Sequence, residues 1–221
     1  TQFSEVKLSV QKLITLHYLT NNIRVIKSNQ IIWFSIWGTA IFWGMSQNLV
    51  AVIPALAKVN LGVTSPLMVN AMLAFSILGI MVGAYVSARK SVNSVKVNNI
   101  YTGSTTITVC AILVPVVATL SFIPNSTALI MVSALILVFG VGAGMMLVPL
   151  NALIQAHSAK DGLGSVLAGK NWIQNMAMIG LLLLTVLLAR SNVNSVYILY
   201  LNAFIAVVGF TVVLKRLKAI L

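Results

Sequence analysis

The chain has 221 residues, of which 59% are hydrophobic and only 7% are charged, and its mean hydropathy is +1.02. An ordinary soluble domain has roughly 25% charged residues, so a polar surface cannot cover this chain and most of its side chains must face lipid. The net charge of +12 does not indicate a nucleic-acid partner, because the basic residues lie at the ends of apolar runs rather than along a stripe.

Residues 1–30 precede the first long apolar run. Their apolar side chains recur at helical spacing, with Lys7 and Lys12 off the stripe. This pattern favours an amphipathic linker helix at the inner membrane surface, with a partly disordered tail as the alternative. The stripe consists of Phe3, Val6, Val10, Leu13 and Ile14.

Six runs are long and apolar enough to cross a bilayer, which takes about 20 residues per helix. Barrel strands are much shorter and alternate in polarity. The sequence therefore predicts an all-α membrane protein with a six-helix transmembrane domain over residues 31–221. The spans are expected at about 31–57, 67–88, 100–123, 128–150, 171–189 and 195–214.

The basic residues alternate between the two sides that these spans define. With a cytoplasmic N-terminus, all of them except Lys58 and Arg190 fall on the inner side. Because cytoplasmic loops are enriched in Lys and Arg, both termini are predicted to be cytoplasmic.

Polar side chains within spans are costly and need a role. Gln47 and Asn48 in the first span either line a water-filled cavity or tie helices together, and the sequence does not separate these readings. The spacing of Gly79 and Gly83, and of Gly140 and Gly144, favours close helix packing.

A dense amide region lies at the inner ends of the fourth and fifth spans. Each set of amides shares one helical face, because its members are three or four residues apart. The two faces are expected to form a hydrogen-bonded gate or a head-group site, with a purely structural contact as the alternative. The candidates are Asn151 and Gln155 on one side and Asn171, Gln174 and Asn175 on the other.

Residues 148–155, with the glycine-rich turn that follows and residues 171–178, resemble the bacterial lysophospholipid transporters of the major facilitator superfamily. The resemblance is close over about forty residues of the printed sequence; elsewhere it is carried by helix number and topology. It implies the second half of a transporter: a linker followed by six helices, around a midplane site shared with a missing N-terminal six-helix half. Residues 83–90 occupy the loop of the superfamily's Gly-x-x-x-Asp-Arg motif, but the acid is absent, with Ser87 and Ala88 in the region.

The resemblance further implies transport of lysophospholipids, chiefly lysophosphatidylethanolamine, to the inner leaflet of the bacterial inner membrane, where a lysophospholipid acyltransferase is a possible partner. A carrier of another amphiphile or drug, or a six-helix substrate-capture module, are the alternatives. The chain is not expected to be an enzyme, because His157 and Asp161 lack acyltransferase spacing. A single cysteine, Cys110, gives no cysteine framework for a metal, and no metal or cofactor is expected.

The orientation can be tested with single cysteines at positions 60 and 192 in a Cys110→Ala background. We expect both to react with a membrane-impermeant thiol reagent in intact cells, because they lie on the outer side. A cysteine at position 96 should react only after permeabilisation, and the reverse pattern would overturn the orientation.

Overall fold

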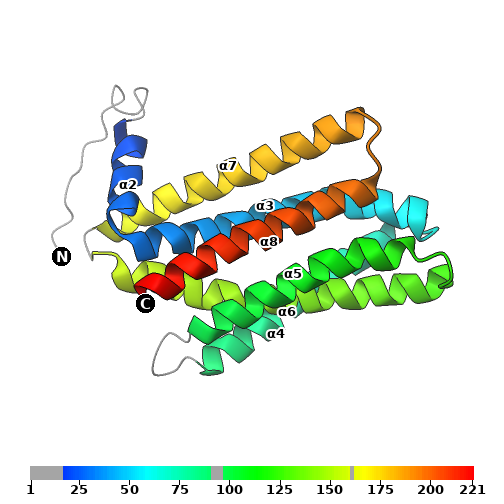
Figure 1. The fold of residues 1–221 in the computed structure, drawn as a ribbon, viewed down its shortest axis with the longest axis horizontal. Coiled ribbons are helices and arrows are strands. Elements are labelled where there is room, and N and C mark those ends of the chain that lie inside the picture. Colours follow the sequence, from blue (N-terminus) through cyan, green and yellow to red (C-terminus); the bar gives the residue numbers. More distant parts are fainter. Residues whose placement is uncertain (1–16, 91–96, 160–161) are drawn as a thin grey trace.

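The computed structural model describes residues 17–90, 97–159 and 162–221, and within them every long element is an α-helix (Figure 1). The apolar stripe expected between Phe3 and Ile14 lies outside these residues. The helices are α2 (His17–Ser28), α3 (Gln30–Asn60), α4 (Pro66–Lys90), α5 (Val97–Thr119), α6 (Asn125–His157), α7 (Leu163–Arg190) and α8 (Ser195–Ile220).

Helices α3 to α8 are long and apolar enough to cross a membrane, which confirms the expected six-helix membrane fold. Most of them extend past the apolar runs, because a helix keeps its backbone hydrogen bonds beyond the hydrocarbon layer. Helix α6 continues to His157, and α7 already begins at Leu163. Helix α5 is an exception, since it ends at Thr119 rather than near Ile123, where the chain turns before Pro124.

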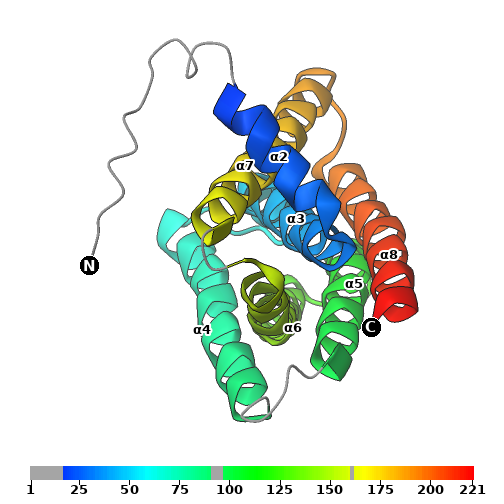
Figure 2. The same ribbon diagram turned by 90° about the vertical axis from the view of Figure 1, so that its left-hand side faces the viewer.

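The six long helices form two triplets along the chain, α3–α5 and α6–α8, and each triplet packs mainly against helices of the other. Helix α3 packs mainly on α7 and α8, while α6 packs mainly on α4 and α5, and α5 contacts α8 (Figure 2). If each helix is replaced by its counterpart in the other triplet (α3 by α6, α4 by α7, α5 by α8), the same helix pairs are in contact. Because α3 and α6 run in opposite directions, this is the packing of an inverted repeat.

Helices α4 and α6 approach each other so closely that their backbones touch. A Cβ atom added at Gly79 or Gly83 would overlap backbone atoms of α6, and one added at Gly140 or Gly144 would overlap backbone atoms of α4. On another side of α6, Gly142 meets Gly103 of α5 in the same way. The close packing expected from the glycine spacing is thus confirmed, and α6 is held by glycine contacts on two sides.

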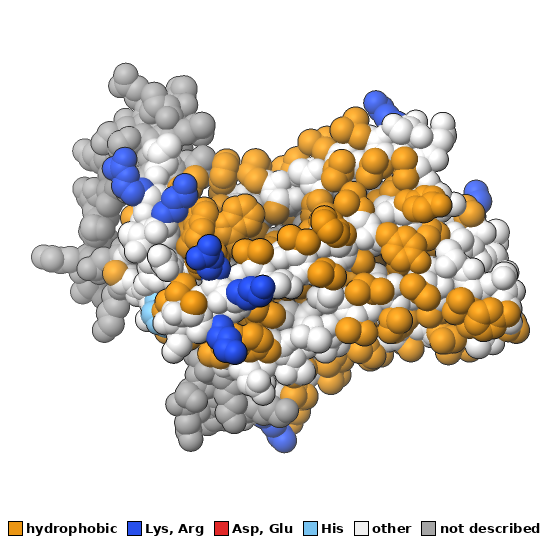
Figure 3. Space-filling model, viewed as in Figure 1, with side chains coloured by type: hydrophobic (Ala, Val, Ile, Leu, Met, Phe, Trp, Pro, Cys, Tyr) orange, Lys and Arg blue, Asp and Glu red, His pale blue; other side chains and the backbone are white. Residues whose placement is uncertain are grey.

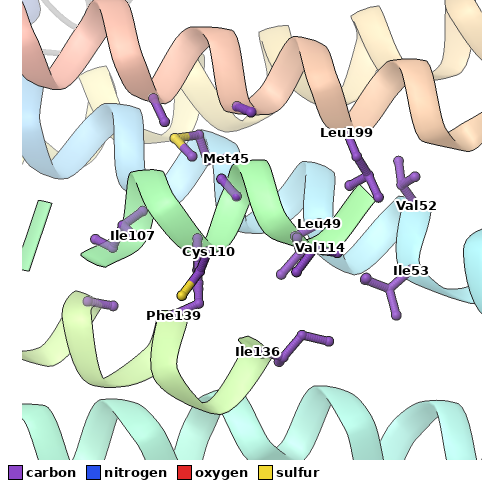
Figure 4. Packing of buried hydrophobic residues seen from close by; sticks show 14 of the residues in the cluster. Met45, Leu49, Val52, Ile53, Ile107, Cys110, Val114, Ile136, Phe139 and Leu199 are labelled. Carbon is purple, nitrogen blue, oxygen red and sulfur yellow. The ribbon is translucent and has the colours of Figure 1, made fainter. Parts of the chain in front are cut away.

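The main core lies between α3, α5, α6 and α8. Figure 4 shows residues of this core: Cys110 of α5 lies near Phe139 of α6, and Leu199 of α8 lies near Val52 of α3. Phe42 and Phe139 stack with ring centroids 6.0 Å apart, joining the first helices of the two triplets. Helices α4 and α7 are the least buried spans, and they flank the side of the bundle that lies opposite α5 and α8.

Basic side chains gather at one end of the bundle, where α2 lies and α8 ends (Figures 1 and 3). We call this the basic end. In the described part of the chain, only Lys58 and Arg190 lie at the opposite end, in the last turns of α3 and α7. Which end faces the cytoplasm remains the prediction made from the sequence.

The glycine contact between α4 and α6 predicts a position-specific effect of added methyl groups. Gly83→Ala should lower the apparent melting temperature of the 221-residue chain in detergent, because overpacking typically costs about 1–3 kcal/mol. Gly180→Ala is the matched control, since a Cβ there meets nothing within 4 Å. Equal melting temperatures for the two variants would contradict the backbone contact.

Candidate functional site

The amide region at the basic end contains a lysine–amide pair between α6 and α7. The Lys170 ammonium donates a hydrogen bond of 2.5 Å to Asn151 Oδ1. Asn151 Nδ2 donates to Leu147 O in its own helix at 2.8 Å, which orients the amide so that its oxygen faces α7. Both side chains are partly buried, so the pair lies at the margin of the bundle rather than in bulk solvent.

The other candidate amides of this region do not share one environment. Gln155, Asn171 and Asn175 are exposed, whereas Gln174 is buried and its Nε2 has no partner. Among the hydrogen bonds of the described residues, none joins an amide of α6 to an amide of α7. The structure therefore brings Asn151 to Lys170, and leaves the role of the remaining amides as a prediction.

Helix α7 presents these residues on two separate faces. Lys170 and Gln174 are four residues apart and share one face, and Asn171 and Asn175 share the next. The first face lies toward the packed bundle, because Lys170 reaches α6 and Gln174 is 7% exposed. The second face is uncovered in this chain.

Lys170 is not among the site residues that the sequence pattern predicts. The sequence places it only on the inner side of the membrane, as one of several basic residues near helix ends. Its position in the sequence could have indicated it. Lys170 lies four residues before Gln174, so the two share a helical face, and it directly precedes Asn171. A charged side chain within a membrane helix is by default a functional candidate.

A second polar layer lies near the middle of α3. Trp43 is exposed and Gln47 is partly exposed, whereas Asn48 is only 1% exposed and its Oδ1 has no partner. Nearby, Asn202 of α8 donates from Nδ2 to Met45 O at 3.2 Å. Asn48 is thus placed inside the bundle and Gln47 toward its surface, so the two candidates differ in their access to a ligand.

The segment that lacks the motif acid contains a neutral hydrogen-bond network. Ser87 is fully buried, accepts from Asn99 Nδ2 at 3.2 Å and donates to Met145 O at 3.4 Å. These bonds join α4, α5 and α6 at the basic end without any charge. A neutral hydroxyl thereby links three helices in the segment where the resemblance would place a carboxylate.

The described residues include no carboxylate side chain, since Glu5 and Asp161 both lie outside them. No cluster of metal-ligating side chains is found in the same part of the chain. His157 ends α6 and its Nδ1 lies 3.0 Å from Leu153 O, so it belongs to a helix end rather than to a loop. The groups offered to a ligand are amides, aromatic rings and one partly buried ammonium.

Comparisons with known proteins show what the sequence of this chain is similar to. A model of the Major Facilitator Superfamily matches residues 3–175. Lysophospholipid transporters LplT from Yersinia pestis (strain Pestoides F) and Yersinia pseudotuberculosis (serotype O:3, strain YPIII) are each 31% identical over 156 residues, which is 67% of this chain and 34% of the relative. The match therefore spans about a third of the relatives' own length. No solved structure matches.

The family model covers well over half of the chain, and the structure has six membrane-spanning helices in two triplets with the packing of an inverted repeat. The chain is a multi-pass membrane protein whose relatives are transporters rather than enzymes. On this evidence it belongs to the major facilitator superfamily.

Proposed function

We propose that this chain is one half of a carrier that moves lysophospholipids, chiefly lysophosphatidylethanolamine, to the inner leaflet of the bacterial inner membrane by alternating access. The observation that carries the proposal is the hydrogen bond from Lys170 to Asn151, in the segment whose sequence resembles lysophospholipid transporters. At the inner leaflet, the transported lipid would be available to a lysophospholipid acyltransferase.

The head group of the proposed substrate has a phosphate and an ammonium group. An ammonium side chain and amide nitrogens are donors for phosphate, while amide oxygens accept from the substrate ammonium. Lys170 and Asn151 supply both kinds of group at one place. No carboxylate is needed for a zwitterion, which fits the neutral polar groups of the described bundle.

The exposed parts of α3 and α7 form this chain's wall of the proposed substrate path. Trp43 and Gln47 lie near the middle of α3, and Asn171 and Asn175 form the uncovered face of α7. In this superfamily the substrate site lies at the midplane, where repeats meet. We infer that an N-terminal six-helix half covers these residues and provides the other wall.

Substitutions at the lysine–amide pair, and at Asn175 on the uncovered face of α7, test the proposed head-group contact in the full-length transporter. Lys170→Gln, Asn151→Ala and Asn175→Ala should each reduce the initial rate of labelled lysophosphatidylethanolamine uptake about tenfold. The reason is that a hydrogen bond to the charged head group of the substrate contributes about 1.5–3 kcal/mol. Folding should survive, because a membrane hydrogen bond averages only about 0.6 kcal/mol.

Lys215→Gln and Asn70→Ala are matched controls, since both side chains are exposed and lie away from the pair. Expression and membrane insertion should be equal across all variants, and Lys170→Arg should retain most of the uptake. Wild-type rates in Lys170→Gln and Asn151→Ala would make the pair structural. Unchanged lipid uptake together with altered uptake of a drug or another amphiphile would favour the alternative substrate class.

The half-carrier proposal predicts that residues 1–221 alone do not transport. Proteoliposomes with this chain should show no lysophospholipid uptake above empty vesicles, because the site has only one wall. Joining the chain to its N-terminal half should restore uptake. Full uptake by residues 1–221 would show that they act alone or as a homodimer, and lipid binding without uptake by either form would favour a capture module.

A further inference from the structure

A groove lined by tryptophans lies between α2, α3 and α7 at the basic end. Its volume is about 420 Å³. Trp37, Trp172 and Met176 are each about 40% exposed, so the groove is open on one side. Its lining includes Lys27 of α2, Trp33 and Trp37 of α3, and Trp172 and Met176 of α7.

Helix α2 is fixed in place as one wall of this groove. Ile26 is fully buried in a small core with Ile36 and Ile173, and Gly169 leaves the space that the Ile26 side chain occupies. Asn29 caps α3, since its Oδ1 accepts from the backbone nitrogens of Ile31 and Ile32 at 3.0 and 3.3 Å. The wall is therefore anchored at its buried face and at its joint with α3.

The rim of the groove is positively charged. Lys27 lines it, and the Lys27 ammonium lies 5.3 Å from the centre of the Trp33 ring. Arg24 is exposed on the same helix. No carboxylate of the described residues neutralises these charges. An occupant must therefore combine an apolar body with an anionic head.

The groove is separate from the proposed transport contact. Trp172 and Met176 are four residues apart and share one face of α7, whereas Lys170 and Gln174 share a different face. The Lys170 ammonium is bonded to α6, and α6 contributes no residue to the groove. One helix thus presents an amide-rich side and an aromatic side.

We propose that this groove binds one anionic phospholipid of the surrounding leaflet, independently of any transported substrate. The acyl chain lies along Trp37, Trp172 and Met176, and the phosphate lies at Lys27. Tryptophans that flank a basic residue at a helix end are typical of the membrane–water interface. A basic residue near the surface attracts an anionic lipid with about 1 kcal/mol, so a preference of about fivefold over a zwitterionic lipid is expected.

Tryptophan fluorescence can test the site directly, because three of the four tryptophans line the groove. In a Trp43→Phe variant, the remaining tryptophans report only on the groove. This variant is reconstituted in phosphatidylcholine vesicles with increasing brominated phosphatidylglycerol, or with brominated phosphatidylcholine. Quenching should show about fivefold preference for phosphatidylglycerol, and Lys27→Gln should reduce the preference to about one.

Three controls make the result specific. A reporter that retains only Trp43, with Phe at the other three positions, should show no preference. Lys218→Gln on α8 should leave the preference at the groove unchanged, and Lys27→Arg should keep it. Circular dichroism and melting temperature should show that all variants are folded.

The proposal is overturned if both lipids quench the groove tryptophans equally, or if Lys27→Gln keeps the full preference. It is also overturned if neither lipid quenches them, which would mean that protein covers the groove. Loss of uptake in the transport assays would leave this result unaffected, since the quenching experiment contains no lysophospholipid.

Discussion

The bundle depends on backbone contacts between α6 and its two neighbours. Helices surrounded by lipid gain little from burying apolar side chains against each other, so close packing has to supply the attraction. Gly140 and Gly144 bring α6 against α4, and Gly142 brings it against α5. A side chain at any of these positions would force the backbones apart, and with them the two triplets that meet through Phe42 and Phe139.

The tight contacts around α6 contrast with the loose packing of α7. Helix α7 is the least buried span, and different residues of its first turns take part in different environments. Lys170 reaches α6, Ile173 enters the small core under α2, and Trp172 lines the open groove. A helix that few neighbours hold can provide several binding surfaces. The proposed substrate contact, half-carrier interface and lipid site all lie on it for this reason.

The candidate site shows where helical spacing is informative and where it is not. Spacing grouped Asn171, Gln174 and Asn175 on one face. Asn171 and Asn175 do share an exposed face, because that depends only on the helical repeat, but Gln174 is buried on the neighbouring face, so its grouping with them is wrong. Spacing could not give the rotation of α7 about its axis relative to α6. The structure pairs Asn151 with Lys170, the residue just before the expected amides. It likewise buries Asn48 while leaving Gln47 partly exposed, although the two are adjacent.

The six membrane helices, the separation of the basic residues between two sides and the close-packing glycines can all be predicted from the sequence. Each of these follows from local hydropathy, charge or spacing, which act on one segment at a time. The three-dimensional packing is needed to show that α4 and α5 both pack on α6, that Ser87 bridges three helices, and that α2 packs on α7 through Ile26. These contacts join segments that are far apart in the chain. They depend on which helix faces pack together with the fewest voids, and this cannot be read from any one segment alone.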